Sequence, residues 1–80
     1  MAREDILRQI NEIFIEILDD EKLILTETTQ AADVEDWDSL NHIQLIVAIE
    51  KHFNIRFKSR EIQSWGNVGE MINSIQEKQK

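Results

Sequence analysis

The chain has 80 residues, of which 16 are Asp or Glu and 9 are Lys or Arg, so its formal charge at pH 7 is −7. Hydrophobic residues make up 41% and charged residues 31%, a composition typical of a folded globular protein. This length allows one domain, residues 1–80, and leaves no room for a large internal catalytic cavity. The absence of cysteine excludes disulfides, thiolate metal sites and a cysteine nucleophile, so any thiol chemistry needs sulfur from outside the chain.

The acidic balance also excludes two common kinds of partner. Nucleic acids and anionic membrane surfaces both select clustered Lys and Arg. No apolar run approaches the ~20 residues of a membrane span, and the charged N-terminus lacks the pattern of a signal peptide. We therefore expect a cytoplasmic protein with no nucleic-acid partner and no membrane span.

The N-terminal half is predicted to hold one helix and one long loop. The helix covers about residues 2–18, because apolar residues recur there at intervals of three and four: Ile6, Ile10, Ile13 and Ile17, flanked by Leu7 and Phe14. Residues 19–37 show weak alternation and no turn pair, so we expect an ordered loop with room for a short helical turn. Residues 1–38 carry 12 acidic and 3 basic residues, whereas residues 39–80 carry 4 acidic and 6 basic residues.

The C-terminal half is predicted to hold three helices. Asp38 and Ser39 offer an N-terminal cap for an apolar helix that runs to Phe53 and ends at Asn54, which tolerates the left-handed conformation. Apolar residues lie on most sides of this helix, which predicts a central helix packed on several sides, with one face formed by Leu40, Ile43, Val47 and Phe53.

Two further helices follow the central one. Ser59 is expected to cap a short helix that ends near Ser64. The stretch from Asn67 to Glu70 has the spacing of a capping box and opens a last helix with inward Met71, Ile72 and Ile75. The predicted fold class is all-α: a four-helix bundle with a long loop between helices 1 and 2 and a short third helix.

Candidate catalytic and metal-binding groups are sparse. Ser39, His42 and Asp38 contain the residue types of a hydrolase triad, but no glycine elbow is present and the domain is too small for a sheltered cleft. The acidic run Asp33, Glu35, Asp36 and Asp38 lacks the glycine and glutamate of an EF-hand loop. His42 and His52 have no third ligand, and Trp37 and Trp65 are expected to serve packing. We predict no catalytic residue and no metal site.

Asp38-Ser39-Leu40, at the head of an apolar helix and behind a long acidic loop, resembles the prosthetic-group site of acyl carrier proteins. The resemblance continues through Ile43, the run from Leu45 to Glu50 and Phe53-Asn54-Ile55, and covers essentially the whole chain. It implies a group carrier rather than an enzyme, of the acyl-carrier fold, with 4′-phosphopantetheine attached to the Ser39 hydroxyl through a phosphodiester. Acyl intermediates would be carried on that arm as thioesters.

The resemblance also implies a set of partners. These are a phosphopantetheinyl transferase, a ligase or acyltransferase that loads the arm, and downstream synthase enzymes. The residues expected to meet them are Asp38, Leu40, Gln44, Val47 and Glu50, with Leu40 and Val47 as the apolar contacts.

The helix after Ser39 departs from carriers of general fatty-acid synthesis, which resemble each other in having acids along its exposed face. Asn41, Gln44, Lys51 and His52 stand where such acids are expected. A carrier in a specialised pathway (polyketide, natural-product or unusual lipid) therefore fits better. Two alternatives stay open: an aminoacyl carrier of the peptidyl type, and an unmodified helical adaptor that binds a partner helix.

Overall fold

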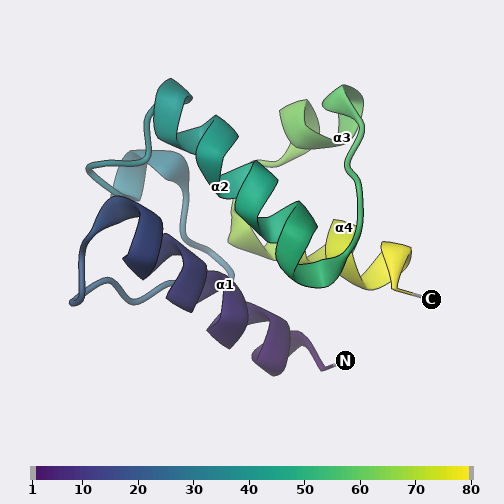
Figure 1. The fold of residues 1–80 in the computed structure, drawn as a ribbon, viewed down its shortest axis with the longest axis horizontal. Coiled ribbons are helices and arrows are strands. Elements are labelled where there is room, and N and C mark those ends of the chain that lie inside the picture. Colours follow the sequence, from purple (N-terminus) through teal and green to yellow (C-terminus); the bar gives the residue numbers. More distant parts are fainter. Residues whose placement is uncertain (1, 80) are drawn as a thin grey trace.

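The computed structural model of the protein describes residues 2–79. It contains four α-helices, α1 (Arg3–Leu18), α2 (Ser39–Phe53), α3 (Ser59–Ser64) and α4 (Val68–Lys78), and a 3₁₀ turn, η1 (Ala31–Asp33), in the loop that joins α1 to α2 (Figure 1). No strand occurs between residues 2 and 79. The all-α fold with a short third helix, predicted from the spacing of apolar residues and from candidate helix caps, is confirmed.

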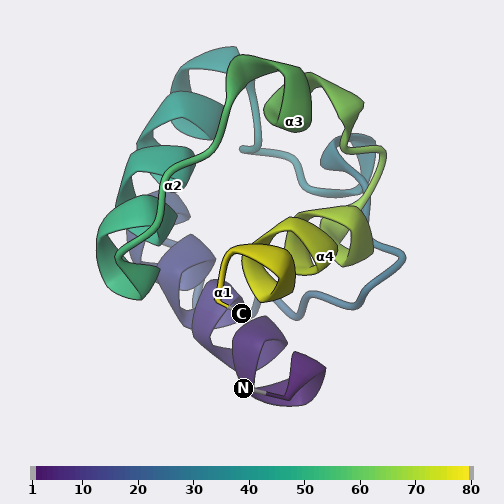
Figure 2. The same cartoon turned by 90° about the vertical axis from the view of Figure 1, so that its right-hand side faces the viewer.

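The helices surround one apolar core. α1 packs against α2 and α4, and α3 packs against α4 (Figure 2). The fully buried side chains of α1 follow the four-residue spacing of a single face, and α2 and α4 complete the core: Ile6, Ile10 and Phe14, with Leu45 and Ile49, and Val68, Met71, Ile72 and Ile75. Burial of these side chains is the main driving force for folding, since no disulfide is available.

The expectation that α2 is packed on several sides is wrong. Its buried residues are Leu45, Ile46 and Ile49, whereas Leu40, Ile43 and Val47 are 69%, 63% and 44% exposed. At ~100° per residue these two apolar groups lie on nearly opposite sides of the helix. The core therefore uses one side of α2, and the other side presents an apolar row to solvent, which we call the α2 stripe (Leu40, Ile43 and Val47).

Two of the expected helix caps are corrected by the structure. Lys58, not Ser59, is the residue before α3, and its backbone N–H donates to Glu61 Oε1 at 3.0 Å. Asn67 does cap α4, accepting from the Glu70 N–H at 3.0 Å, but the Glu70 carboxylate accepts from the N–H of Gly66 rather than from that of Asn67.

The end of α2 agrees with the sequence analysis. Asn54 has a left-handed backbone, with φ 55° and ψ 50°, and its N–H donates to the carbonyl of Glu50. α2 therefore stops where the asparagine predicts.

The long loop is tied to the start of α4. The N–H groups of Val68 and Gly69 donate to the carbonyl oxygens of Thr29 (2.9 Å) and Glu27 (2.7 Å). A Cβ on Gly69 would lie 2.9 Å from that Glu27 oxygen, so this close approach requires glycine. Arg3 adds an ion pair with the Glu27 carboxylate, which lowers the pKa of that carboxyl below its usual value.

Candidate functional site

The first turn of α2 presents Ser39 to solvent. Asp38 has an extended backbone (φ −103°, ψ −177°), and its Oδ1 accepts from the Asn41 N–H at 2.9 Å, so Asp38 is the N-cap. Ser39 is the first helical residue, and its exposed hydroxyl has no hydrogen bond to any residue between 2 and 79. The expectation that the Ser39 hydroxyl shares in capping is therefore wrong, and this oxygen has no structural role.

His42 lies one turn after Ser39 but is oriented by Trp37. The indole Nε1–H of Trp37 donates to His42 Nδ1 at 2.8 Å, and the indole packs edge-on against Phe14 with ring centroids 4.9 Å apart. Burial lowers the pKa of His42, which favours the neutral imidazole that this bond requires. Because Nδ1 is an acceptor here, it cannot donate to Asp38 as in a Ser-His-Asp triad, so the three residues do not form one.

Two adjoining hollows lie beside Ser39. The outer one, about 270 Å³, is lined by Ala31, Trp37, Asp38, Ser39 and His42. The inner one, about 120 Å³, shares Ala31, Trp37 and His42 and continues to Ile62, Trp65, Gly66, Asn67 and Met71. Trp65 is held there by a hydrogen bond from its Nε1 to Ser74 Oγ at 3.0 Å. Both tryptophans pack against the core, as predicted.

Two of the four acidic residues before α2 accept backbone hydrogen bonds. Asp33 accepts from the Gln30 N–H at 2.9 Å, as Asp38 does from Asn41. In the part of the chain that the structure describes, no three His, Cys, Asp or Glu side chains converge on a point where a metal ion could bind.

Of the five residues expected to meet partners, Asp38 precedes α2 as its N-cap and the other four lie on α2, where they are not equally available. Leu40 and Val47 belong to the α2 stripe, and Gln44 is exposed beside them. The Glu50 carboxylate is half-buried and accepts from the Phe57 N–H at 2.8 Å, so it anchors the α2–α3 connection.

Ile43 is a surface residue that was not predicted from the sequence. From the apolar pattern of α2 it was expected in the packed face, but this side chain is 63% exposed between Leu40 and Val47. The polar residues Gln44 and Lys51 share that side of the helix, and this was the available signal that the row faces solvent.

These residues fit a phosphodiester on Ser39. The oxygen is accessible, and the unpaired N–H groups of the first turn of α2 favour an anion. Neighbouring Asp38 opposes that attraction, so a phosphate here would stay at the surface. Such geometry suits the attachment of a group better than catalysis.

Comparison with known proteins identifies the class of the chain as a phosphopantetheine-bearing carrier, since the model of the phosphopantetheine attachment site family matches residues 8–75. The acyl carrier protein of Phenylobacterium zucineum is 31% identical over 74 residues, which cover 92% of this chain and 94% of that protein. That of Caulobacter vibrioides is 32% identical over 74 residues, which cover 92% and 95%.

The fold, too, is similar to that of an acyl carrier protein. The solution structure of the holo acyl carrier protein from Geobacter metallireducens superposes with a TM-score of 0.85 at 38% identity, over 91% of this chain and 84% of that one. The chain belongs to the acyl carrier protein family. It is accordingly a carrier rather than an enzyme, its cofactor is covalently attached phosphopantetheine, and its partners are transferases and synthase enzymes. None of the helices within residues 2–79 has the length and apolar character needed to cross a membrane.

Proposed function

We propose that Ser39 is the residue to which 4′-phosphopantetheine is attached, and that residues 1–80 form a single carrier domain. The observation that supports this most is the exposed, unbonded hydroxyl of Ser39 at the first residue of α2. A modifying transferase needs an accessible oxygen, and Asp38 already supplies the cap that the helix needs. Modification of Ser39 therefore removes no interaction from the fold.

The surroundings of Ser39 suit a mobile arm. When attached, 4′-phosphopantetheine supplies the terminal thiol that the cysteine-free sequence lacks, and acyl groups are carried on it as thioesters. The amides of the first turn of α2 orient the phosphodiester, while Asp38 keeps it from being held tightly. Partner enzymes then reach both Ser39 and the α2 stripe from one side.

We assign the apolar part of partner docking to Leu40 and Val47, and we add Ile43, which is exposed between them. Asp38 and Gln44 supply polar contacts at the exposed surface. Glu50 is the weakest member of this set, because a partner that engages its carboxylate must compete with the Phe57 N–H.

The charge of α2 favours a specialised pathway, such as one for a polyketide, another natural product or an unusual lipid. Lys51 and Gln44 flank the α2 stripe, and Glu50 is the one acidic residue in α2, so long-range attraction to a strongly basic enzyme is weak. An aminoacyl carrier loaded by an adenylating ligase is the alternative, since the loading enzyme selects the cargo. Family membership disfavours the unmodified adaptor, and the cytoplasmic location stays a prediction.

Attachment is tested by incubating the chain with coenzyme A and a broad-specificity phosphopantetheinyl transferase and then measuring the intact mass. We expect a gain of one phosphopantetheine, lost in Ser39→Ala and retained in Ser59→Ala. Ser59 is a matched control, because it is also an exposed serine at the first position of a helix. A gain that persists in Ser39→Ala would refute the assignment.

The pathway proposal is tested with a ketosynthase of general fatty-acid synthesis. The double variant Gln44→Glu, Lys51→Glu introduces acids beside the α2 stripe. The kcat/KM of the ketosynthase for this variant should exceed its kcat/KM for the natural sequence at low salt, and the difference should fall as salt is added. Lys22→Glu, a charge change in the α1–α2 loop, should have no such effect. A carrier of natural sequence that, once loaded, already reacts as fast as the double variant would contradict a specialised role. Loading assays with aminoacyl-adenylating and acyl-adenylating ligases then separate the two carrier types.

A further inference from the structure

Ile24, in the loop after α1, is 81% exposed, which is more than any residue of the α2 stripe. Its position is fixed by Asn11 of α1, whose side-chain amide donates to the Leu23 carbonyl at 3.2 Å and whose Oδ1 accepts from the Leu25 N–H. Leu25 is buried and Leu23 half-buried, so the loop is anchored on both sides of Ile24. The chain therefore holds this isoleucine out in solvent.

An apolar cleft of about 370 Å³ adjoins Ile24. Leu7, Ile24 and Leu25 form its apolar lining, and the polar residues that line it are Asn11, Glu4, Arg8 and Glu12. We call this surface the α1 patch. An exposed apolar surface rimmed by polar residues is typical of a site for protein–protein contact.

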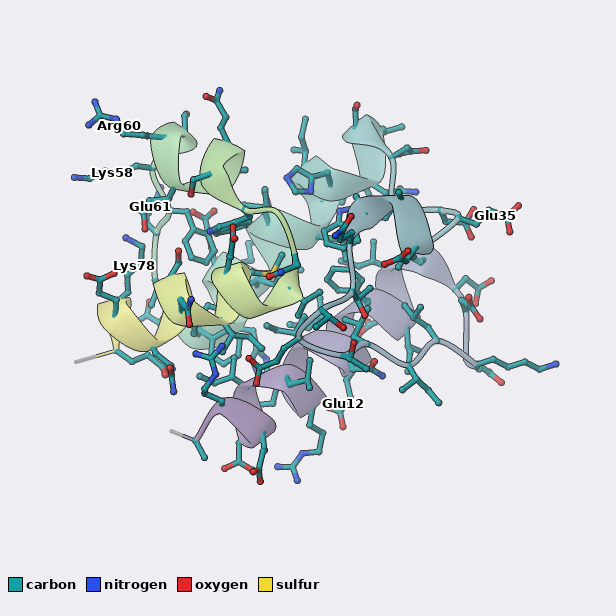
Figure 3. The ribbon with its side chains drawn as sticks, turned by 180° about the vertical axis from the view of Figure 1, so that it is seen from behind. Glu12, Glu35, Lys58, Arg60, Glu61 and Lys78 are labelled. Carbon is teal, nitrogen blue, oxygen red and sulfur yellow. The ribbon has the colours of Figure 1, made fainter. Side chains whose placement is uncertain are left out.

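The rim of the α1 patch is acidic. Arg8 forms an ion pair with Asp5 at 3.3 Å, whereas the carboxylates of Glu4 and Glu12 have no cation within ion-pair distance among residues 2–79. Figure 3 shows Lys58, Arg60 and Lys78 gathered beside α3 and the end of α4, while Glu12 projects from α1 away from them. The patch therefore lies in the acidic half of the molecule. A second copy of the chain would bring the same acids against each other, so a basic partner is favoured.

The α1 patch is separate from the side of α1 that carries α2. His52 of α2 is hydrogen-bonded to Gln9, which lies on the other flank of α1 from Asn11. A protein bound at the α1 patch would therefore leave Ser39 and the α2 stripe accessible to a second enzyme.

We propose that the α1 patch is a docking site for a basic amphipathic helix of a partner protein. A bulky aliphatic side chain of that helix occupies the cleft between Leu7 and Ile24, and flanking Lys or Arg residues pair with Glu4 and Glu12. Charge attraction for a basic partner, which is weak along α2, is then supplied by the acidic residues of α1. This inference does not depend on Ser39 being modified.

The test uses a synthetic helical peptide of leucine and lysine with one apolar face, and an isomer of the same composition in scrambled order. Titration into the isotope-labelled chain should shift the amide resonances of Leu7, Asn11 and Ile24 and give a saturable Kd. Ile24→Ser should weaken binding about tenfold, because it removes one buried aliphatic contact. The pair Glu4→Gln, Glu12→Gln should weaken binding and reduce its dependence on salt.

Glu35→Gln is the control, because it changes an exposed residue of the α1–α2 loop outside the α1 patch and should leave Kd unchanged. Equal binding of the scrambled peptide, shifts confined to α2, or an unaltered Kd for Ile24→Ser would each overturn the proposal. The amide spectrum of each variant shows that it is folded. The mass gain at Ser39 is measured independently, so failure of docking at the α1 patch is distinguishable from failure of attachment.

Discussion

Asp38 and Ser39 are adjacent residues with opposite roles, and this difference can be measured. Asp38→Ala removes the hydrogen bond to the Asn41 N–H and a carboxylate at the start of α2. Loss of such a cap costs about 1 kcal/mol, and the lost attraction between the carboxylate and the helix dipole adds about 0.3–1 kcal/mol. Ser39→Ala removes no hydrogen bond, so the free energy of unfolding should change by less than about 0.5 kcal/mol.

Urea denaturation and thermal unfolding, both followed by circular dichroism, provide the measurement. For a domain of this size, a loss of about 1 kcal/mol lowers Tm by about 4–8 °C, which is well resolved. Asp38→Asn is an informative control: asparagine caps as well as aspartate, so it should lose only the contribution of the charge.

Equal destabilisation by Ser39→Ala and Asp38→Ala would refute this reasoning, because the serine hydroxyl would then share the cap. The result also decides how the attachment assay is interpreted. If Ser39→Ala is as stable as the natural chain, its failure to gain mass reflects the missing oxygen and not unfolding.

Three further changes follow from the packing. Gly69→Ala should cost about 1–3 kcal/mol, because the new Cβ meets a loop carbonyl at 2.9 Å, whereas Gly66→Ala meets only ordinary contacts and should be tolerated. Ile10→Ala should cost about 2–5 kcal/mol and Ile24→Ala less than about 0.5 kcal/mol, since the first side chain is fully buried and the second is 81% exposed. Burial lowers the pKa of His42 in the native state. As the pH falls, the imidazole of His42 is therefore protonated in the unfolded chain before it is protonated in the native state. Stability should therefore decrease below about pH 6.5, and His42→Asn, which keeps an acceptor for the indole N–H, should remove that part of the decrease.

Urea midpoints measure all three effects, with those for His42 taken at about pH 7.5 and about pH 6. A Gly66→Ala variant that is destabilised as much as Gly69→Ala would contradict the steric argument. Equal losses for Ile10→Ala and Ile24→Ala would mean that the loop isoleucine is structural. An unchanged pH dependence in His42→Asn would show that His42 contributes nothing to it.

Local patterns predicted most of the fold. The spacing of isoleucines in α1 and the left-handed asparagine after α2 act over one or two turns, so they can be recognised in the sequence. The choice between Asp38 and Ser39 as cap could not be made, because both residue types are good caps and the difference lies in one backbone conformation.

The buried side of α2 was harder to predict for a different reason. Leu40, Ile43 and Val47 are as apolar as residues of the core, so their own side chains do not show which side of α2 is exposed, and only the polar neighbours Gln44 and Lys51 do. The bonds of Asn11 to the loop and of the Val68 and Gly69 amides to Thr29 and Glu27 join residues far apart in the chain. No local pattern reports such pairs, so the α1 patch was not anticipated.

The bonds from Val68 and Gly69 to the α1–α2 loop have a consequence for synthesis on the ribosome. Their carbonyl partners, Thr29 and Glu27, are made long before α4 emerges, so this loop reaches its final form only when the last helix has been translated. The nascent chain must hold its apolar α1 face incompletely covered until then. α4 is therefore required before the α1–α2 loop and the core can reach their native form.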